Sequence, residues 1–395
     1  MRILLICILS ALTLCPGYAQ SVFPIRIDPD NALGGQLSQL FDAVDYIPLE
    51  TTNESLFGRV DKLIITNKYY FILDHSTDVI LLFTRAGRFY SKISLNRLVK
   101  TPNRESLGIH DFTVNEAAGT VLVTHWEKQN CLYVFDFHGN LQKIIKDKVW
   151  HSFACIDSAH YLMESGGNIL DSAKHLSGNC IITDRNIAIF EKFLLKKLES
   201  DFNIAAGQSI TNMLNSNSIF YTRSYDYNAY LINGNGIQGI YQFLFPLGYT
   251  LPKNFLDSSF IGKQRDYIFN HNVVYGLSDI YKVKDNLLFC IQKFEAPAHL
   301  SLLYNLKSGN LYSPYNVTPD SSNGFLPFSS GDQVNVLAAD SSSFYTSVPA
   351  YELIAAYEAS KDKSPVYKLP IQAFLKKNDR KSNPIIVRLR LRDNL

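Results

Sequence analysis

A four-strand pattern recurs along this chain, and its clearest copy runs from Val60 to Ile93. There, short runs of apolar and aromatic residues alternate with polar turns, as VDKLIITNKYYFILDHSTDVILLFTRAGRFYSKI. Four short strands in a meander have sheet faces that must be covered, so a single unit would be marginally stable. The fold therefore depends on whether the chain repeats the unit.

The second copy of the unit lies between Ile109 and Ile145. Phe83 to Gly87 of the first copy matches Phe135 to Gly139 of the second, an offset of 139 − 87 = 52 residues. In both copies the glycine stands in the turn before the last strand. A period of this length with four strands per unit is typical of a β-propeller.

Later copies are more degenerate, but they keep the order of strands and turns. The predicted blades cover approximately residues 60–93, 109–145, 153–195, 212–245, 280–312 and 334–348. The sixth unit lacks an outer strand pair of its own, and a ring that does not close leaves exposed edges. We expect residues 44–51 and 384–391 to complete it, because Val387 to Leu391 alternates as a strand does.

Four segments fall outside the repeat. Residues 21–39 are expected to be irregular, and residues 251–275 to form a long, partly helical connection. Helices are expected at 349–360 and 371–377. The prediction is one all-β domain over residues 20–395, a six-bladed β-propeller of four-stranded antiparallel blades, closed by pairing N- and C-terminal strands.

Residues 1–19 have the features of a signal peptide. Arg2 precedes an apolar run from Ile3 to Leu14 that is too short to span a membrane. Gly17-Tyr18-Ala19 offers small residues at the positions that a signal peptidase reads, so we expect cleavage after Ala19. Cys15 raises the alternative of a lipid anchor, but the preceding leucine is bulky where lipid attachment normally requires a small residue. No other run is apolar and long enough to span a bilayer. We expect an exported protein, in the periplasm, at the cell surface or outside the cell.

The net charge and the cysteine positions limit which partners and which disulfides we expect for this chain. A net charge of +2 provides no strong field that would select nucleic acid. The basic residues from Lys376 to Arg392 alternate with apolar ones, which indicates a charged edge strand. The four cysteines left after cleavage stand in apolar runs, which favours buried free thiols, with a Cys155–Cys180 disulfide as the alternative.

Several stretches resemble a family of exported bacterial six-bladed β-propeller proteins that are related in shape to NHL-repeat propellers. These stretches are DYIPLETTNESLFGRVDKLI, FILDHSTDVILLFTRAGRF, YVFDFHGNLQKI, INGNGI and NPIIVRLRL. The resemblance covers nearly all of the mature chain and implies the same fold. It implies no particular reaction. Many relatives look like lipoproteins, and the Leu14-Cys15 pair departs from them in this respect.

Signatures of catalysis and of cofactor binding are not found in the sequence. It contains no G-x-S-x-G, no H-E-x-x-H and no phosphate-binding glycine loop. Gly234-Asn235-Gly236 indicates a β-turn, and Asp74 to Asp78 lacks most of the ligands of a calcium loop. We therefore expect no cofactor and no metal.

The repeat itself suggests where a ligand would bind. In a propeller, the loop after the second strand of each blade opens on the same face as the connections between blades, around the central channel. The residues that end the second strands form a chemically mixed ring. This ring, with the neighbouring His75, comprises Asp74, His75, Trp126, Glu164, Arg223, Gln292 and Ser347.

Each of these residues also has a structural interpretation, which we weigh more heavily one by one. Asp74 can begin a turn, Trp126 can pack between blades, and Glu164 with Arg223 can form a solvated ion pair. The adjacent His110 and Asp111 are expected to point to opposite faces of a strand, which argues against a catalytic pair.

Two hypotheses of function follow. The favoured one is an exported, non-catalytic binding or scaffold module that presents its channel face to a polar ligand, a glycan or peptide, or to a partner protein of the envelope. The alternative is a lyase or hydrolase with an acid–base site in the central channel, in which Asp74, His75, Glu164 or Arg223 would act. The first is favoured because no catalytic constellation is found.

Overall fold

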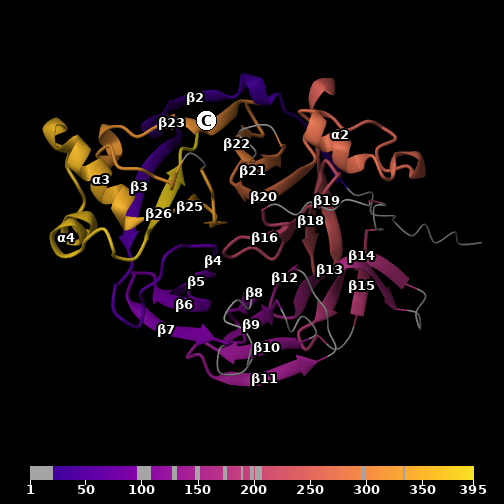
Figure 1. Ribbon diagram of the computed structural model, residues 1–395, viewed down its shortest axis with the longest axis horizontal. Coiled ribbons are helices and arrows are strands. Elements are labelled where there is room, and N and C mark those ends of the chain that lie inside the picture. Colours follow the sequence, from indigo (N-terminus) through magenta and orange to yellow (C-terminus); the bar gives the residue numbers. More distant parts are fainter. Residues whose placement is uncertain are drawn as a thin grey trace, which may run out of the picture.

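Six β-sheets stand around one axis in the computed structural model (Figure 1). This confirms the prediction of an all-β, six-bladed β-propeller. The described residues are 21–95, 108–126, 131–146, 152–171, 176–187, 190–195, 200, 207–294, 299–331 and 334–395.

Blades 1 to 3 are four-stranded antiparallel sheets whose strands follow chain order from the axis outwards (Figure 1). Blade 1 contains β4 (Lys62–Ile65), β5 (Tyr69–Asp74), β6 (Val79–Thr84) and β7 (Phe89–Ser94). Blade 2 contains β8 (Ile109–Asn115), β9 (Thr120–His125), β10 (Cys131–Asp136) and β11 (Leu141–Lys146). Blade 3 contains β12 (Ser152–Cys155), β13 (His160–Asp171), β14 (Leu176–Asp184) and β15 (Phe190–Leu194).

Blades 4 to 6 combine strands from distant parts of the chain. Blade 4 contains β16 (Ile210–Asn212), β17 (Ile219–Tyr221), β18 (Asn228–Asn233), β19 (Gly236–Leu244) and β1 (Ser21–Arg26). Blade 5 contains β20 (Gly276–Val283), β21 (Asn286–Gln292), β22 (His299–Asn305), β23 (Leu311–Thr318) and β2 (Leu33–Gln36). Blade 6 contains β24 (Ala338–Ala339), β25 (Ser343–Val348), β26 (Ile385–Leu391) and β3 (Phe41–Pro48).

The N-terminal segment differs from the irregular chain expected for residues 21–39. β1 pairs in parallel with β19, from Ser21 opposite Gly239, and β2 pairs in parallel with β23. Each therefore adds a fifth, outer strand to a blade that is already complete. Parallel partners far apart in the chain share no hairpin turn, so this pairing leaves no local signal in the sequence.

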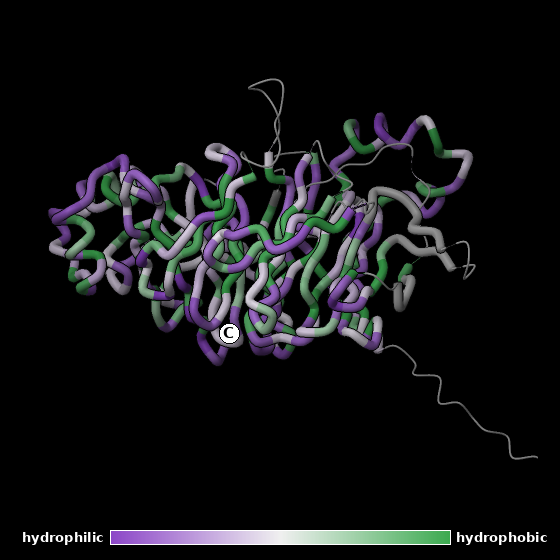
Figure 2. Tube along the Cα trace, turned by 90° about the horizontal axis from the view of Figure 1, so that it is seen from below, coloured by the Kyte–Doolittle hydropathy of each residue, from purple (hydrophilic) through white to green (hydrophobic). Residues whose placement is uncertain are grey.

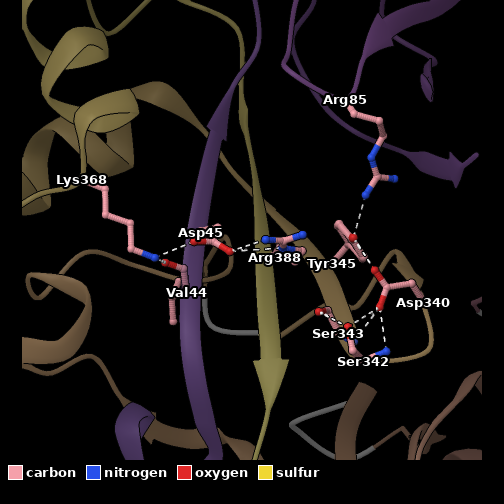
Figure 3. A network of polar contacts seen from close by, with 9 residues as sticks. All are labelled: Val44, Asp45, Arg85, Asp340, Ser342, Ser343, Tyr345, Lys368 and Arg388. Carbon is pink, nitrogen blue, oxygen red and sulfur yellow. Dashed lines mark hydrogen bonds and ion pairs between the residues drawn. The ribbon is translucent and has the colours of Figure 1, made fainter. Parts of the chain in front are cut away.

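The ring closes as predicted, by antiparallel pairing of β26 with β3, which lie side by side in Figure 1. Asp45 of β3 joins the two strands to Lys368, the residue directly before the helix α4 (Leu369–Lys377) (Figure 3). Its carboxylate accepts hydrogen bonds from Arg388 of β26 at 2.6 Å and from Lys368 at 2.5 Å. Beside it, the Tyr345 hydroxyl donates to Asp340 at 2.6 Å and accepts from Arg85 of blade 1 at 2.9 Å. These contacts tie the closing blade to its neighbour.

The core lies between the blades. Alternate residues of a strand point to opposite faces, so each blade buries one face against the blade before it and one against the blade after it. Phe71 and Leu82 of blade 1 pack with Phe112 and Val123 of blade 2, and all four are fully buried. Burying a side chain of this kind contributes about 1.5–3 kcal/mol.

Glycines in the turns between the third and fourth strands bring adjacent blades into contact. Gly87 has φ +81°, and a Cβ at this position would lie 2.1 Å from the carbonyl oxygen of Pro48 in blade 6. Gly139 has φ +85°, and its Cβ would lie 2.5 Å from the carbonyl oxygen of Lys92 in blade 1. The turn backbone therefore packs directly on the outer strand of the preceding blade, which only glycine permits.

Helices lie at the periphery of the ring. The structure contains α1 (Leu37–Leu40), α2 (Gln264–Asn270), α3 (Ala350–Ser360) and α4 (Leu369–Lys377), with 3-10 turns η1 (Pro29–Asn31), η2 (Leu247–Tyr249), η3 (Ser258–Phe260), η4 (Ser321–Asn323) and η5 (Lys361–Lys363). The helices expected at 349–360 and 371–377, and the partly helical connection, are confirmed. That connection rises from one face of the disc (Figure 2). No helix within the described ranges has the length and apolar character needed to cross a membrane.

The cysteines in the described part of the chain are free thiols. Cys180 and Cys290 are buried, and Cys131 and Cys155 are half-buried. The favoured prediction of free thiols is therefore confirmed, and the Cys155–Cys180 disulfide is not formed. The expected signal peptide and Cys15 lie outside the described residues.

Candidate ligand site at the channel mouth

Two adjoining cavities open where the innermost strands begin. The first, of about 250 Å³, is bordered by residues at the starts of β4, β8, β12 and β16, so four blades contribute to it. The second, of about 300 Å³, lies between blades 5 and 6 and reaches the axis. Both are lined by Asp61, Gly207 and Gln208. The first strands of the blades begin on this face, and this is the usual face for ligand sites in such folds.

A half-buried ion pair forms one wall of the first cavity. Lys62 begins β4, and its Nζ lies 2.6 Å from Oδ1 of Asp111 in β8, so the pair links blades 1 and 2. The lysine side chain is only 17% exposed and the aspartate only 14%. Lys62 Nζ also lies 5.5 Å from the centre of the Phe112 ring. Held by these contacts, the ammonium presents a fixed positive charge to the cavity.

A carboxylate–imidazole pair of blade 1 also lines the first cavity. Asp61 accepts a hydrogen bond from the backbone N–H of His75 at 2.8 Å, and its Oδ2 lies 3.4 Å from the ring Nδ1 of His75. The bond to Asp61 outweighs partial burial and raises the pKa of His75. Burial alone would raise the pKa of Asp61, but the bonds from His75 and the nearby charge of Arg59 lower it overall.

A β-bulge places two polar side chains of β8 on the same cavity. The pairing of β8 with β9 shifts register between Ile109 and Asp111, so His110 is the extra residue. Both His110 and Asp111 line the first cavity. Although they are neighbours in β8, both residues border this cavity, because the bulge interrupts the regular alternation of the strand at this point.

A second bulge, in β20, positions Asp279 in the other cavity. The register shifts between Ser278 and Tyr281, and Asp279 adopts φ +52°, a left-handed conformation that aspartate tolerates better than most residues. Asp279 Oδ1 accepts from the N–H of Gln208 at 3.2 Å, and Oδ2 accepts from the Ser278 hydroxyl at 2.7 Å. Burial outweighs these bonds and raises the pKa of Asp279 to about 6.

Gly207 makes this arrangement of Asp279 sterically feasible. It has φ +72°, and a Cβ at this position would lie 2.2 Å from Ser278 Oγ and 2.3 Å from Asp279 Oδ2. A side chain at residue 207 would therefore displace the carboxylate. Residues in strained conformations with shifted pKa values gather at functional sites more often than elsewhere.

Asp74 and His75, the first members of the predicted ring, lie close together but differ in role. The Asp74 carboxylate is fully buried and accepts hydrogen bonds at 2.6 Å from the hydroxyls of Ser76 and Thr77. It also accepts from the N–H of Gly58 at 3.3 Å. Its oxygens are thus occupied by their own turn, whereas His75 lines the first cavity.

Glu164 lies immediately behind the cavity wall. It accepts hydrogen bonds from the hydroxyl of Ser209, a lining residue, at 2.9 Å and from the hydroxyl of Tyr221 at 2.6 Å. It therefore joins blade 3 to blade 4. Burial is the largest influence that raises the pKa of Tyr221, and the charge of Glu164 adds to it.

Arg223 belongs to a neighbouring network in blade 4. Its Nε donates to Asp226 at 2.7 Å, and one terminal nitrogen donates to the Tyr230 hydroxyl at 3.4 Å. Burial alone would lower the pKa of Arg223, but the charge and hydrogen bond of Asp226 raise it overall. Both side chains are less than 15% exposed, at 14% and 8%. This is a buried pair rather than a solvated one.

The other three ring residues lie at different distances from the cavities. Trp126 packs its ring edge-to-face on His110, with the ring centres 3.9 Å apart, so it adjoins the first cavity. Gln292 is buried beside Gly276, and Ser347 is half-buried in β25. Neither Gln292 nor Ser347 is among the described residues that line the two cavities.

Sequence reasoning missed most of the lining residues because it followed the ends of the second strands. The starts of the first strands carry a comparable polar series: Asp61 and Lys62, His110 and Asp111, Ser152, Ser209, and Asp279. Aligning the units on these positions would have revealed them. The bulges would have remained hidden, since nothing local in the sequence marks them.

The arrangement offers carboxylates, cations and amides from several blades within one mouth. Such a set can form hydrogen bonds with a polar ligand from several directions. Within the described ranges, no group of three or more His, Cys, Asp or Glu side chains is arranged to hold a metal ion.

Comparison with one solved structure supports the fold, and a second is reported beside it. A protein of Bacteroides fragilis described as exported matches with a TM-score of 0.67 at 13% identity, over 94% of this chain and 100% of that one. A member of the DUF4221 family from Bacteroides vulgatus matches with a TM-score of 0.45 at 10% identity, over 89% and 97% of the two chains. No curated protein matches the chain. A family model described as a domain of unknown function, DUF4934, matches residues 22–390, so the chain belongs to the DUF4934 family.

Proposed function

We propose that this protein is an exported binding module that holds a polar ligand at the channel mouth. The observation that carries the proposal is the cavity bounded by the Lys62–Asp111 and Asp61–His75 pairs, to which four blades contribute. A ligand there would contact side chains whose positions are fixed by existing hydrogen bonds, so little ordering would be needed on binding.

The mixed chemistry of the mouth favours a glycan or a short peptide over a strongly charged ligand. Carboxylates at Asp61, Asp111 and Asp279 can accept from hydroxyls or amides, while Lys62 and His75 can donate. The charges are largely paired, so they would serve as directional donors and acceptors. A partner protein that inserts a polar loop into the mouth would use the same contacts.

Export is supported by two independent observations. The N-terminal sequence has the basic start, apolar run and small residues of a signal peptide, with cleavage proposed after Ala19. The protein of similar fold from Bacteroides fragilis is described as exported. Expression of the full chain, followed by N-terminal sequencing of the secreted or periplasmic product, tests this; a product that keeps Met1 in the cytoplasm contradicts it.

Ligand binding is tested by a thermal-shift screen of soluble oligosaccharides and short peptides against the mature chain. Hits are retested with Lys62→Gln and Asp61→Asn, which should weaken binding about tenfold or more, since each breaks a charge-assisted contact in the mouth. Lys376→Gln and Asp362→Asn, both exposed on the distant helical edge, serve as matched controls. Hits that respond equally to all four substitutions would rule out the channel mouth.

A lyase or hydrolase is the second candidate, and the Asp61–His75 pair is the observation that favours it. An imidazole oriented by a carboxylate beside a cavity is the arrangement of a general base. Turnover of a screened ligand that His75→Gln abolishes, while binding persists, would establish this candidate. Binding without turnover in the unmodified chain would exclude catalysis for that ligand.

A further inference from the structure

A groove of about 680 Å³ separates blades 2 and 3, at the opposite end of the strands from the channel mouth. Its lining comes from the turns β8–β9, β12–β13 and β14–β15 and from β11. In an antiparallel blade these turns lie on the face away from the connections between blades. The groove is thus a separate feature from the cavities on the axis.

One residue distinguishes the blade 3 side of the groove from the matching turns of blades 1 and 2. Gly87, Gly139 and Ile187 occupy the same place in blades 1, 2 and 3, because each donates its N–H to the carbonyl three residues earlier, at 2.8, 3.1 and 3.0 Å. In blades 1 and 2 the glycine packs against the outer strand of the preceding blade. In blade 3 a bulky side chain stands at this position, so the turn cannot approach β11 equally closely.

Ile187 holds this position in an unfavourable conformation. Its φ is +58°, a genuine outlier for a β-branched residue, and its side chain is only 1% exposed. It packs with Tyr161, Val134 and Leu122, and these four side chains with Ile145 form an apolar floor for the groove. Backbone strain that persists beside a cavity is a known mark of function.

Two exposed cations also line the groove. Lys143 of β11 and Arg185 of the β14–β15 turn both line the groove and are exposed. Across the part of the chain that the structure describes, neither side chain forms an ion pair or hydrogen bond with another residue. The histidine of the groove is different, because His160 Nδ1 lies 2.9 Å from Asp157 Oδ1. The groove therefore combines an apolar surface with two exposed positive charges, and the half-buried Asp184 also lines it.

We propose that this groove binds a small amphiphilic anion, with its apolar body on the floor and its carboxylate or similar acidic group between Lys143 and Arg185. A volume of about 680 Å³ falls within the range of small-molecule sites, roughly 300–1,000 Å³. The floor lies recessed between two blades, so it suits a free molecule rather than the flat surface of a bilayer. This site is independent of the function proposed for the channel mouth.

The test uses octanoate as the probe and 1-octanol as its neutral counterpart, measured by titration calorimetry on the mature chain. Octanoate should bind more tightly than octanol. The double variant Lys143→Gln/Arg185→Gln should weaken octanoate about three- to tenfold, the effect of two exposed charge contacts, and leave octanol unchanged. The control variant Lys376→Gln/Lys377→Gln removes two exposed cations from α4 and should change neither.

A second variant tests the location without altering charge. Ala118 is an exposed turn residue on the rim of the groove, and Ala118→Trp should abolish binding of both probes by filling it. Ala86→Trp places the same bulk on an exposed turn of blade 1 and should have no effect. Thermal melts confirm that each variant folds.

Three outcomes would overturn the proposal. These are no saturable binding of octanoate, binding that Ala118→Trp leaves intact, and an equal loss in the control variants. An anionic lipid surface could supply the same combination of apolar chain and acidic group. Sedimentation with phosphatidylglycerol vesicles tests for this second source. Binding to vesicles that depends on Lys143 and Arg185, without binding of free octanoate, would reassign the groove to a lipid surface and contradict the free ligand.

Discussion

Asp279 combines three unusual features of the channel mouth: a bulge, a left-handed backbone conformation and a raised pKa. It is the bulged residue of β20, has φ +52°, and burial raises its pKa from 3.8 to about 6. The folded chain therefore binds the proton more tightly than the unfolded chain does. Stability contributed through this group is present below about pH 4 and is lost as the pH rises through about 6.

Asp279→Asn should consequently stabilise the protein at neutral pH and not at pH 4. Asparagine tolerates the left-handed conformation and can keep the bonds with Gln208 and Ser278, but it carries no charge to desolvate. We expect a gain of about 1–2 kcal/mol at pH 7 and almost none at pH 4, measured by urea unfolding. The exposed Asp362→Asn is the control; equal gains at both pH values would contradict the assignment.

The His75–Asp61 pair should respond to pH in two opposite ways. The raised pKa of His75 means that its contribution to stability is complete below its unfolded pKa and is lost as the pH rises through the folded value. The lowered pKa of Asp61 means that its contribution is lost as the pH falls through the folded value. His75 is 42% exposed, so solvent screening keeps the energy of the pair small.

At the scale of strands and turns, some turn glycines are needed for close contact between blades as well as for a positive φ. Gly87 and Gly119 both have positive φ, at +81° and +65°, but only Gly87 abuts a neighbouring blade. Gly119→Ala should cost about 1 kcal/mol, the effect of the conformation alone. Gly87→Ala should cost about 2–4 kcal/mol, because its Cβ would also collide with Pro48. Equal losses in urea unfolding would show that close approach is unimportant.

The charge network on the closing strands should contribute modestly and depend on salt. Asp45 is 24% exposed between Lys368 and Arg388, which are 61% and 36% exposed. Asp45→Asn should cost about 1 kcal/mol in low salt and less in about 1 M NaCl, where charges are screened. Arg380→Gln, which breaks a pair exposed at 58% and 49%, is the control and should cost less. A loss that does not change with salt would attribute the effect to packing.

Structural features that depend on a few adjacent residues could be predicted from the sequence. The turn glycines at 87 and 139 revealed the repeat, and the alternation from Val387 to Leu391 revealed the closing strand, because each depends on a few adjacent residues. The parallel strands β1 and β2 were not predictable, since their partners lie more than two hundred residues away and no hairpin links them. For the candidate site, the sequence predicted only the face of the ring on which it lies and not most of the residues that line it. Its lining depends on bulges at His110 and Asp279 that propensity does not specify.

At the scale of the whole molecule, the two ends of the chain play unequal parts in stability. β1 and β2 lie outside complete blades, and Val22, Phe23 and Leu33 on them are 52%, 45% and 50% exposed. β26 instead lies between β25 and β3 within blade 6. Five of its apolar residues are no more than 1% exposed: Ile385, Ile386, Val387, Leu389 and Leu391.

Truncations at either end should therefore have opposite outcomes. A chain that begins at Leu37 loses β1 and β2, with buried Ile25 and Ile27, and should remain a cooperative fold that is weaker by about 3–6 kcal/mol. A chain that stops at Asn383 loses β26, which leaves β3 and β25 without a partner and the ring open. Open rings expose strand edges that promote association. The shorter, C-terminal deletion should abolish the cooperative melt seen by circular dichroism and elute as aggregates in gel filtration. A C-terminally truncated chain that melts cooperatively as a monomer would show that closure is dispensable.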